Sequence, residues 1–418
     1  MNMKSFVKDK SLASQGQMNI DLARSQMGAL EKIRARFRKE LPFKDLRVAM
    51  ALHVTKETAN LVHALRDGGA MVSIAGCNPL STQDDVAAAL EASGVSVFAY
   101  KGETKEDYYK FLHTVLDSSP HATIDDGCDL VSLVHTERKN LLSQLIVGTE
   151  ETTTGVIRLR AMEKDRALKV PVIAVNDNLT KHLFDNYYGT GQSTLDGILR
   201  ATNILFAGKT LVVAGYGDCG KGVANRARGL GARVIVTEVD PVRALQAHAD
   251  GFASMPMEKA VPLGDVFVTV TGNKHVLRGE HFQRMKNNAI LANSGHFNIE
   301  IDTDTLEKMA KGKKRVRWQL DEFDLGGKKV FLVGEGRLVN LAAAEGHPSE
   351  VMDLSFCGQA MALEFGVKNK GKLAAGVHVL PPSVDADIAR FKLESLGLEI
   401  DSLTDEQIAY LNSWQEGT

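Results

Sequence analysis

The chain alternates short apolar runs with stretches of helical spacing, and this alternation limits its possible folds more than any other feature. The first series of apolar runs lies at 46–51, 70–76, 95–101 and 122–127. The second series lies at 209–217, 232–240, 265–272, 289–296 and 330–336. Hairpin turn chemistry does not separate the runs of the first series, which predicts a parallel sheet flanked by helices, and the second series predicts a second open sheet of this kind. We therefore expect an α/β chain with two doubly wound parallel-sheet domains and a hinge between them.

The same patterns suggest how the chain divides. Apolar spacing predicts one long amphipathic helix at 18–38, and a link at 177–205 that begins as a polar loop and ends in a helix. The expected parts are a first substrate-binding part at 1–188, a dinucleotide-binding domain at 189–345, a return to the first domain at 346–385 and a short C-terminal helical segment at 386–418.

Composition excludes several classes of protein. Fifty basic against 52 acidic side chains give a net charge of −2, which marks no nucleic-acid or anionic-membrane partner. No window approaches the ~18 consecutive apolar residues of a membrane span, and the N-terminal residues lack the apolar core of a secretory signal. The four cysteines show no paired metal-ligand spacing, which predicts a reduced, cytoplasmic chain without a metal site.

A glycine-rich turn follows the apolar run LVVA and opens a helical pattern. Gly215, Gly217 and Gly220 form GxGxxG, and Glu238 ends the next run, 21 residues after Gly217. Such glycines allow a tight turn, the approach of a pyrophosphate and close helix packing. The Glu238 carboxylate would accept from ribose hydroxyls and repel a 2′-phosphate, so we expect a Rossmann-like domain that binds NAD rather than NADP. Arg243 could meet a phosphate, but the pattern favours a solvated helix position.

Polar side chains gather where the apolar runs should end, which is where ligands bind in open α/β sheets. Each cluster alone also fits a helix cap. Lys181 and Asp185 differ, because at i and i+4 they share one face of a helical turn in the interdomain link. A surface ion pair is the alternative, but the neighbouring Asn176 and Asn186 favour a functional site.

The motifs resemble, in their order, the S-adenosyl-L-homocysteine hydrolase family from about Leu46 to Met361. The most specific are GYGDCGKG and EETTTG, and the others are HVTKETANL, CNPLSTQDD, IDDGCDL, VNDNLTKHLFDN, NSGHF, EGRLVNL and GHPSEVM. The resemblance implies reversible cleavage of S-adenosylhomocysteine to adenosine and homocysteine, with a tightly held NAD that is regenerated in each cycle. Oxidation of the ribose 3′-hydroxyl would acidify the 4′-hydrogen, the 5′-thiolate would leave, water would add, and the ketone would be reduced again.

The resemblance implies roles for several acidic and basic residues. Lys181 and Asp185 would act on the 3′-hydroxyl, a task that suits a lysine of lowered pKa. Asp126 would remove the 4′-proton, with Asp125 as the less favoured substitute. His53 and His296 would handle the leaving group and the attacking water, because imidazole titrates in the right range, but the division between them stays open.

The resemblance also implies two sets of binding residues. Glu151 would anchor the ribose hydroxyls, and Asn176 and Asn186 would lie around the sugar and the nicotinamide. The remaining substrate-binding residues are Thr55, Glu57, Cys77, Asn78, Ser81 and His347. The NAD-binding residues are Thr152, Thr153, Thr154, Asn186, Gly215, Gly217, Asp218, Gly220, Glu238, Thr271, Asn273 and Asn340.

The purine edge distinguishes two substrates of this chemistry. Adenine presents a donor at N6 and an acceptor at N1, and Thr55 and Glu57 match the pair that recognises it in the family. A Glu57 carboxylate accepts from the 6-amino group, which favours S-adenosylhomocysteine. It could also accept from N1–H of hypoxanthine, so S-inosylhomocysteine stays the alternative.

Two departures from the family and two other functions complete the expectations. Thr190 stands where the family commonly has Cys, and the chain ends at SWQEGT without the longer tail that reaches a neighbouring subunit's NAD. A homotetramer is implied by resemblance only.

A 2-hydroxy-acid-type NAD dehydrogenase would share the fingerprint, but it gives no reason for Thr152–Thr154 beside Lys181 and Asp185. A catalytically silent regulatory relative would have lost one of the acid–base residues, and because all of them are present the sequence disfavours this alternative.

Overall fold

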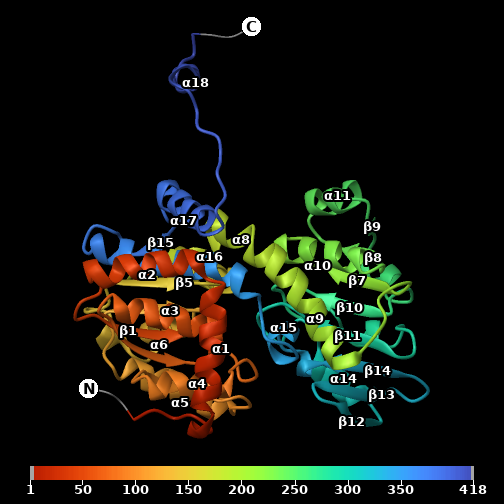
Figure 1. Ribbon diagram of the computed structural model, residues 1–418. Helices are drawn as coiled ribbons and strands as arrows, with labels where there is room; N and C mark the ends of the chain where they lie inside the picture. The colour runs from red at the N-terminus through yellow and green to blue at the C-terminus, as the bar shows by residue number, and fades with distance from the viewer. Residues whose placement is uncertain (1–3, 416–418) are drawn as a thin grey trace.

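The computed structural model describes residues 4–415, which form two lobes, each with its own sheet (Figure 1). The strands of the first sheet are β1 Arg47–Ala51, β2 Met71–Ala75, β3 Ser96–Phe98, β4 Ala122–Asp125, β5 Val147–Glu150, β6 Pro171–Ala174 and β15 Gly376–His378. Those of the second sheet are β7 Thr210–Ala214, β8 Arg233–Thr237, β9 Ala253–Ser254, β10 Val266–Thr269, β11 Ala289–Asn293, β12 Gly312–Arg317, β13 Leu320–Asp324 and β14 Lys329–Val333.

Strand order explains where the two sheets can bind ligands. The first runs β15-β6-β5-β4-β1-β2-β3 and is parallel throughout; the second runs β12-β13-β14-β11-β10-β7-β8-β9. Each sheet contains the strand order 3-2-1-4-5-6 of doubly wound folds, in which ligands bind beyond the carboxyl ends where the order reverses. The reversals lie between β1 and β4 and between β7 and β10. The expected fold class is therefore confirmed.

One edge of the second sheet differs from the expectation. β12 pairs with β13, and β13 with β14, in antiparallel register. Gly326 and Gly327, with φ of 74° and 121°, allow the chain to reverse between β13 and β14. The apolar runs that the sequence analysis singled out do not include β12 and β13, so this antiparallel edge adds to the expected parallel sheet.

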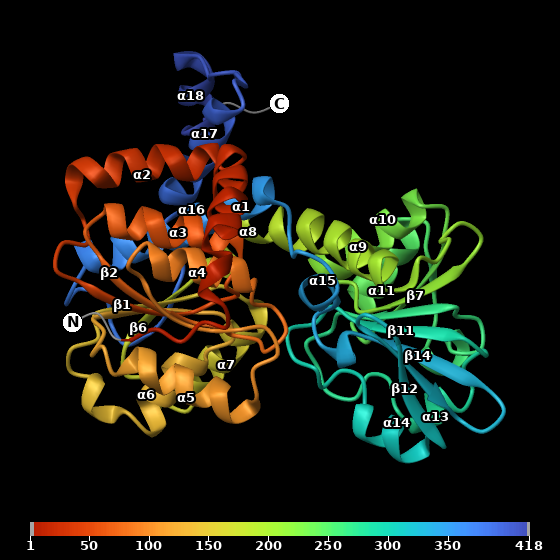
Figure 2. The same ribbon diagram turned by 60° about the horizontal axis from the view of Figure 1, so that its bottom comes forward.

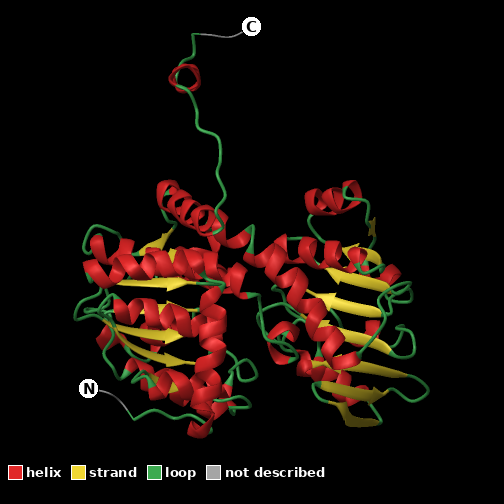
Figure 3. Cartoon of the chain, in the orientation of Figure 1, coloured by secondary structure: helices red, strands yellow, loops and turns green. Residues whose placement is uncertain are grey.

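Helices cover the faces of both sheets (Figures 2 and 3). Alternate residues of β1 supply the two apolar cores of the first lobe, since Val48 and Met50 belong to one and Ala49 and Ala51 to the other. Within residues 4–415, no helix is both long and apolar enough to cross a membrane. The α-helices are α1 Ala13–Ser25, α2 Gly28–Glu40, α3 Lys56–Asp67, α4 Asp84–Ala92, α5 Lys105–Leu116, α6 Asp129–Thr136, α7 Thr153–Lys164, α8 Leu179–His182, α9 Thr190–Thr202, α10 Asp218–Gly229, α11 Pro241–Ala249, α12 Met257–Ala260, α13 Gly279–Phe282, α14 Thr303–Met309, α15 Val339–Ala342, α16 Ser349–Lys368, α17 Pro382–Ser395 and α18 Asp405–Leu411.

The leading helix is two helices, so the expectation of one long helix at 18–38 is wrong. The chain leaves helical geometry at Met27, with φ of −112° and ψ of 56°. The break exposes the first amides of α2 to a distant acceptor: Asp353 on α16 accepts from Ala29 N at 3.1 Å and from Leu30 N at 2.8 Å. Asp353 also pairs with Nζ of Lys392 on α17 at 2.8 Å. One carboxylate thus satisfies a helix N-terminus and joins three helices.

The chain passes between the lobes twice and ends in an arm. α9 leads into the second lobe, and α16 packs again on the first, as expected for residues past 346. α17 packs on α2 and α16, and the expected division at 385/386 falls inside this helix. Residues 396–415 are exposed and α18 lies away from both lobes (Figure 1). The arm carries apolar side chains, including Ile400, Leu411 and Trp414.

The role of Asp353 can be tested by removing its carboxylate. Asp353→Ala removes a fully buried carboxylate and leaves the half-buried Lys392 amine and two helix amides without this acceptor, so we expect a loss of about 3 kcal/mol in the free energy of unfolding. Chemical denaturation of the purified chain measures this loss. Asp387→Ala, which removes the exposed pair with Arg390 on α17, is the matched control with an expected change of less than about 1 kcal/mol. Equal, small effects of both changes would contradict the structural role of Asp353.

Candidate active site between the two lobes

A cavity of about 1050 Å³ lies between the lobes. The first lobe contributes His53, Asp126 and Glu151 to its wall, and the second contributes Gly217 and His296. Each of these residues follows the carboxyl end of a strand, so the topology of the two sheets brings them together. The polar clusters that the sequence places at strand ends therefore meet in one cavity.

Lys181 lies at the centre of a buried polar network, where α8 meets a π-helical turn at Asp185–Gly189. Its Nζ donates to Oδ1 of Asp185 and to Oδ1 of Asn186, each at 2.9 Å, and to Oδ1 of Asn176 at 3.3 Å. Oε1 of Glu151 lies 3.8 Å from the same nitrogen. The Lys181 and Asp185 side chains are only 5% and 7% exposed, which rules out the alternative of a surface ion pair.

The expectation of a lowered pKa for Lys181 is wrong. Burial favours the neutral amine, but the carboxylates of Asp185 and Glu151 outweigh burial and raise the pKa of Lys181. Burial would raise the pKa of Asp185, yet Lys181 and His347 hold this pKa below its ordinary value. Nδ1 of His347 lies 3.0 Å from Oδ2 of Asp185. The pair is therefore an ammonium beside a carboxylate at neutral pH.

The pKa of Glu151 shifts in the opposite direction from that of Asp185. Its burial raises the pKa to about 7, although Lys181 favours the ionised form. The Ser355 hydroxyl donates to Oε1, and Nε2 of Gln359 donates to Oε2 at 2.5 Å. Both donors lie on α16, after the chain has returned from the second lobe. Glu151 is thus a fixed carboxyl group whose charge changes near neutral pH.

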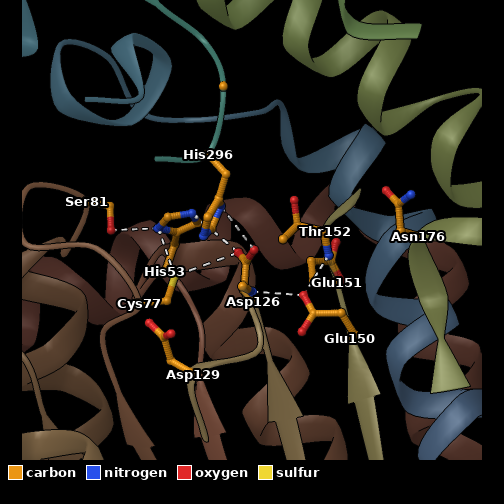
Figure 4. Close-up of polar contacts among 12 residues, drawn as sticks. His53, Cys77, Ser81, Asp126, Asp129, Glu150, Glu151, Thr152, Asn176 and His296 are labelled. Atoms are coloured by element: carbon orange, nitrogen blue, oxygen red, sulfur yellow. Dashed lines mark hydrogen bonds and ion pairs between the residues drawn. The ribbon is translucent and has the colours of Figure 1, made fainter. Parts of the chain in front are cut away.

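Asp126 lies between two histidines that come from different lobes (Figure 4). Nε2 of His53 is 3.4 Å from Oδ2 of Asp126, and Nδ1 of His296 is 3.6 Å from Oδ1. A Cβ at Gly127, where φ is 111°, would lie 2.6 Å from Nε2 of His296. A glycine at this position therefore allows the histidine of the second lobe to approach the first.

His53 does not titrate in the range that the sequence suggested. Burial lowers its pKa to about 4, while Asp126 opposes the shift. Nδ1 of His53 lies 2.7 Å from Oγ of Ser81 and 3.2 Å from Sγ of Cys77. His53 is therefore a neutral imidazole at neutral pH, in contact with groups on both ring nitrogens.

Three predicted substrate-binding residues lie outside the cavity wall. Cys77 and Ser81 contact the far side of His53, and Oδ1 of Asn78 accepts from Leu80 N at 3.0 Å within the same loop. They shape the surroundings of His53. Ligand atoms of Cys77, His53 and Asp126 lie within 4.8 Å of one another, a spacing that a metal ion could bridge. The absence of a metal site stays a prediction.

The structure separates the two neighbouring aspartates. Oδ2 of Asp125 accepts from Val131 N at 3.0 Å, which places this buried carboxyl at the start of α6 and not in the cavity wall. Glu150, which the sequence analysis did not assign, accepts from Gly127 N at 2.9 Å and from Thr152 N at 3.0 Å. The only feature of the sequence that could have pointed to Glu150 is its position at the start of the EETTTG motif. Asp126 alone of the pair faces the histidines.

The predicted purine-recognition residues lie near the hinge. Glu57 is 2% exposed, and its Oε1 accepts from the Ser349 hydroxyl at 2.7 Å. Thr55 caps α3 by accepting from Thr58 N, so the helix-cap alternative holds for Thr55, although its side chain also lines the cavity. His347 lies 3.4 Å from Oγ1 of Thr190, the position where the family commonly has Cys.

The glycine fingerprint has the shape that a dinucleotide requires. Gly215 has φ of 104°, and a Cβ at Gly220 would clash with the carbonyl oxygen of Gly215. At Gly217 a Cβ would meet, outside residues 216–218, only Nη1 of Arg243 within 4 Å among the described residues, so the turn is open toward the cavity. Glu238 directly follows β8 and accepts from Tyr216 N at 2.7 Å, which fixes it beside the fingerprint. The residues present therefore fit a dinucleotide.

The remaining predicted cofactor residues line the same cavity. They are Thr152, Thr153, Thr154, Asn186, Asp218, Thr271, Asn273 and Asn340. Oδ1 of Asn340 is buried without a partner among the described residues, so it can accept a hydrogen bond from a ligand. Thr271 donates through its amide and its hydroxyl to Glu300, which the sequence analysis did not single out. Glu300 thus orients the Thr271 loop.

Comparison with known proteins gives the same identification along the whole chain. Residues 186–346 match the profile described as "S-adenosyl-L-homocysteine hydrolase, NAD binding domain", and residues 4–148 match "S-adenosyl-L-homocysteine hydrolase". NAD is therefore the cofactor of the second lobe.

Full-length relatives carry two names. An S-inosyl-L-homocysteine hydrolase of Methanocaldococcus jannaschii is 58% identical, with 99% of both chains covered. An adenosylhomocysteinase of Thermosynechococcus vestitus is 58% identical over 99% of this chain and 96% of the relative, and one of Aquifex aeolicus is 57% identical over the whole of both chains. The chain is an NAD-dependent hydrolase of the S-adenosyl-L-homocysteine hydrolase family.

Proposed function

We propose that the enzyme hydrolyses S-adenosyl-L-homocysteine reversibly to adenosine and L-homocysteine. The observation that carries the proposal is that the Lys181–Asp185–Glu151 network and the Asp126–histidine group share one cavity with the dinucleotide fingerprint. Bound NAD supplies a hydride acceptor and donor for the 3′ carbon of the ribose. A simple hydroxy-acid oxidation would use no second acid–base group of this kind.

The buried network is suited to the ribose hydroxyls. The Lys181 ammonium and the Asp185 carboxylate hold and receive the proton of the 3′-hydroxyl, and the Glu151 carboxylate accepts hydrogen bonds from the ribose. Asn176 and Asn186 orient the Lys181 amine, to which their side-chain oxygens are bound. With its raised pKa, Lys181 acts chiefly as a charged donor that stabilises oxygen anions.

Asp126 and its histidines are suited to the later proton transfers. The Asp126 carboxylate removes the 4′-proton, and the histidines act at the 5′ carbon. His53, which is neutral because its pKa is about 4, serves as the base that activates water. His296 approaches Asp126 from the opposite side and handles the leaving sulfur. The two histidines thereby receive different roles.

Glu57 supports the adenosyl substrate over the inosyl one. Ser349 already donates to Oε1, which leaves Oε2 as an acceptor for the 6-amino group of adenine. Two relatives named for the S-inosyl compound, from Methanocaldococcus jannaschii and Methanococcus maripaludis, make that substrate the second candidate.

Domain division, assembly and location belong to the same proposal. The proposed division is 4–188 with 346–395 for the substrate lobe, 189–345 for the NAD lobe and 396–415 for the C-terminal arm, so the expected boundary at 385/386 moves to the end of α17. The exposed apolar arm at 396–415 supports assembly into a homo-oligomer, with a tetramer as the family expectation. Charge balance and reduced cysteines support a cytoplasmic enzyme of one-carbon metabolism without nucleic-acid partners.

Thiol release tests the reaction and the substrate together. The purified enzyme should release homocysteine from S-adenosylhomocysteine faster than from S-inosylhomocysteine, with no build-up of free NADH. Glu57→Gln replaces an acceptor by a group that also donates, so we expect the adenosyl-to-inosyl ratio of kcat/KM to fall by about tenfold or more. A wild-type preference for the inosyl compound would move the assignment to the second candidate, and NADH released in step with product would refute the hydrolase.

Replacing Lys181 should separate chemistry from cofactor binding. Lys181→Ala removes the charged donor at the 3′-hydroxyl, so we expect a fall in kcat of about 10²–10⁴-fold. The change should slow the reduction of bound NAD by adenosine, followed at 340 nm, while NAD stays bound. Lys209→Ala, on the exposed edge of the second lobe, is the control. Unchanged reduction in the Lys181 variant would remove it from the mechanism.

Glu151 should impose a pH dependence on nucleoside binding. Its pKa is about 7, and only its ionised form accepts two ribose hydrogen bonds, so adenosine should bind about tenfold more weakly at pH 6 than at pH 8. His53, with a pKa of about 4, stays neutral over this range. Calorimetric titration measures the effect, and Glu151→Gln should flatten the profile. A profile that persists in this variant would assign the titration to another group.

A further inference from the structure

Arg243 lies where the cofactor fingerprint opens to the cavity. Its helix, α11, starts after Glu238 and Asp240 and lies at the edge of the NAD lobe (Figure 1). Nη1 of Arg243 would be 3.6 Å from a Cβ placed on Gly217, and outside residues 216–218 no other described atom lies within 4 Å of that point. Gly217 is the position whose missing side chain admits a pyrophosphate. The guanidinium therefore borders the space that the pyrophosphate enters.

The Arg243 side chain is not held by the acidic groups around it. The Glu238 carboxylate accepts from the amides of Tyr216, Val239 and Asp240, and the Asp240 carboxylate accepts from the amides of Val242 and Arg243. Among residues 4–415, no carboxylate oxygen lies within 4.0 Å of the guanidinium nitrogens. The cation is thus left with its donors free beside the fingerprint.

A cation near the fingerprint would offset the negative charge that gathers there. Asp218, the first residue of α10, adds a carboxylate to the end of the fingerprint that faces the cavity. The other basic groups of the cavity wall have different positions: Lys181 is bound to Asp185, Arg278 pairs with Glu280 at 2.6 Å, and Lys274 lies in the loop after β10. Arg243 is the one that borders Gly217.

We propose that Arg243 is a cofactor-binding residue whose guanidinium donates hydrogen bonds to the pyrophosphate of NAD. The proposal rests on the proposed cofactor site. Arg243 is exposed on α11, as the sequence pattern favours, and the proposal adds a cofactor contact that the pattern did not assign. A planar guanidinium suits a pyrophosphate because it can donate to two oxygens at once. Arg243 thereby offsets the charge of Asp218 and supplements the helix N-terminus of α10.

The exchange of bound NAD tests this role without relying on turnover. The full-length holoenzyme is mixed with excess isotopically labelled NAD, and the loss of the original NAD is followed. Arg243→Met should exchange about tenfold faster than wild type at low salt, and the difference should shrink as added salt screens the lost charge. Arg243→Lys keeps the positive charge but not the planar guanidinium, so its rate of NAD exchange should lie between those of wild type and Arg243→Met. Arg284→Met, which removes an exposed arginine outside the cavity wall, should exchange as wild type does.

The outcomes separate this inference from the proposed function. Wild-type exchange and wild-type salt dependence in Arg243→Met would overturn the role of Arg243 and leave the cofactor site intact. A variant that alters only the uptake of NADP would also overturn it, because the guanidinium would then face the 2′ position of the ribose. If the purified wild-type enzyme released no NAD on denaturation, and the native enzyme bound no added NAD, the cofactor site itself would fail.

Discussion

The buried ammonium of Lys181 and its two carboxylates are the interaction on which the rest of the site depends. Asp185 stands in the π-helical turn that leads out of the first lobe, and Glu151 follows β5 within it. Donors from α16 then fix Glu151 after the chain has returned. Removing the positive charge would leave two carboxyl groups buried without compensation, which is far more costly than losing a surface pair. The hinge and the proposed ribose site are therefore held by the same charges.

Burial acts differently on neighbouring groups and so divides their chemical roles. It lowers the pKa of His53 to about 4 and raises that of Glu151 to about 7, whereas Lys181 and His347 keep Asp185 ionised. A neutral imidazole, a titrating carboxyl and a permanent carboxylate thus coexist in one cavity. Groups whose environments push their pKa values apart are suited to separate acid and base steps. The sequence of proton transfers that we propose needs such a separation.

The local patterns of the sequence predict the fold well and the shifts in pKa poorly. Short apolar runs mark the buried parallel strands, and GxGxxG followed by Glu238 marks the cofactor lobe, because these signals depend on neighbours within one βαβ unit. The break at Met27 and the positions of Ser355 and Gln359 depend on contacts with residues hundreds of positions away. The raised pKa of Lys181 likewise follows from how closely two carboxylates approach it. Such distances are a property of the packed structure and leave no trace in spacing.

The contact between Asp126 and His296 ties catalysis to the arrangement of the lobes. Asp126 follows β4 in one sheet and His296 follows β11 in the other, and a glycine at 127 is needed for them to approach. Lobes that move apart would take His296 away from Asp126 and would also admit water to the cavity. The arrangement that completes the acid–base group is therefore the one that protects a reactive ketone from solvent. Proton transfer and water exclusion thus share a single geometric condition, and the chain needs no separate lid to enforce it.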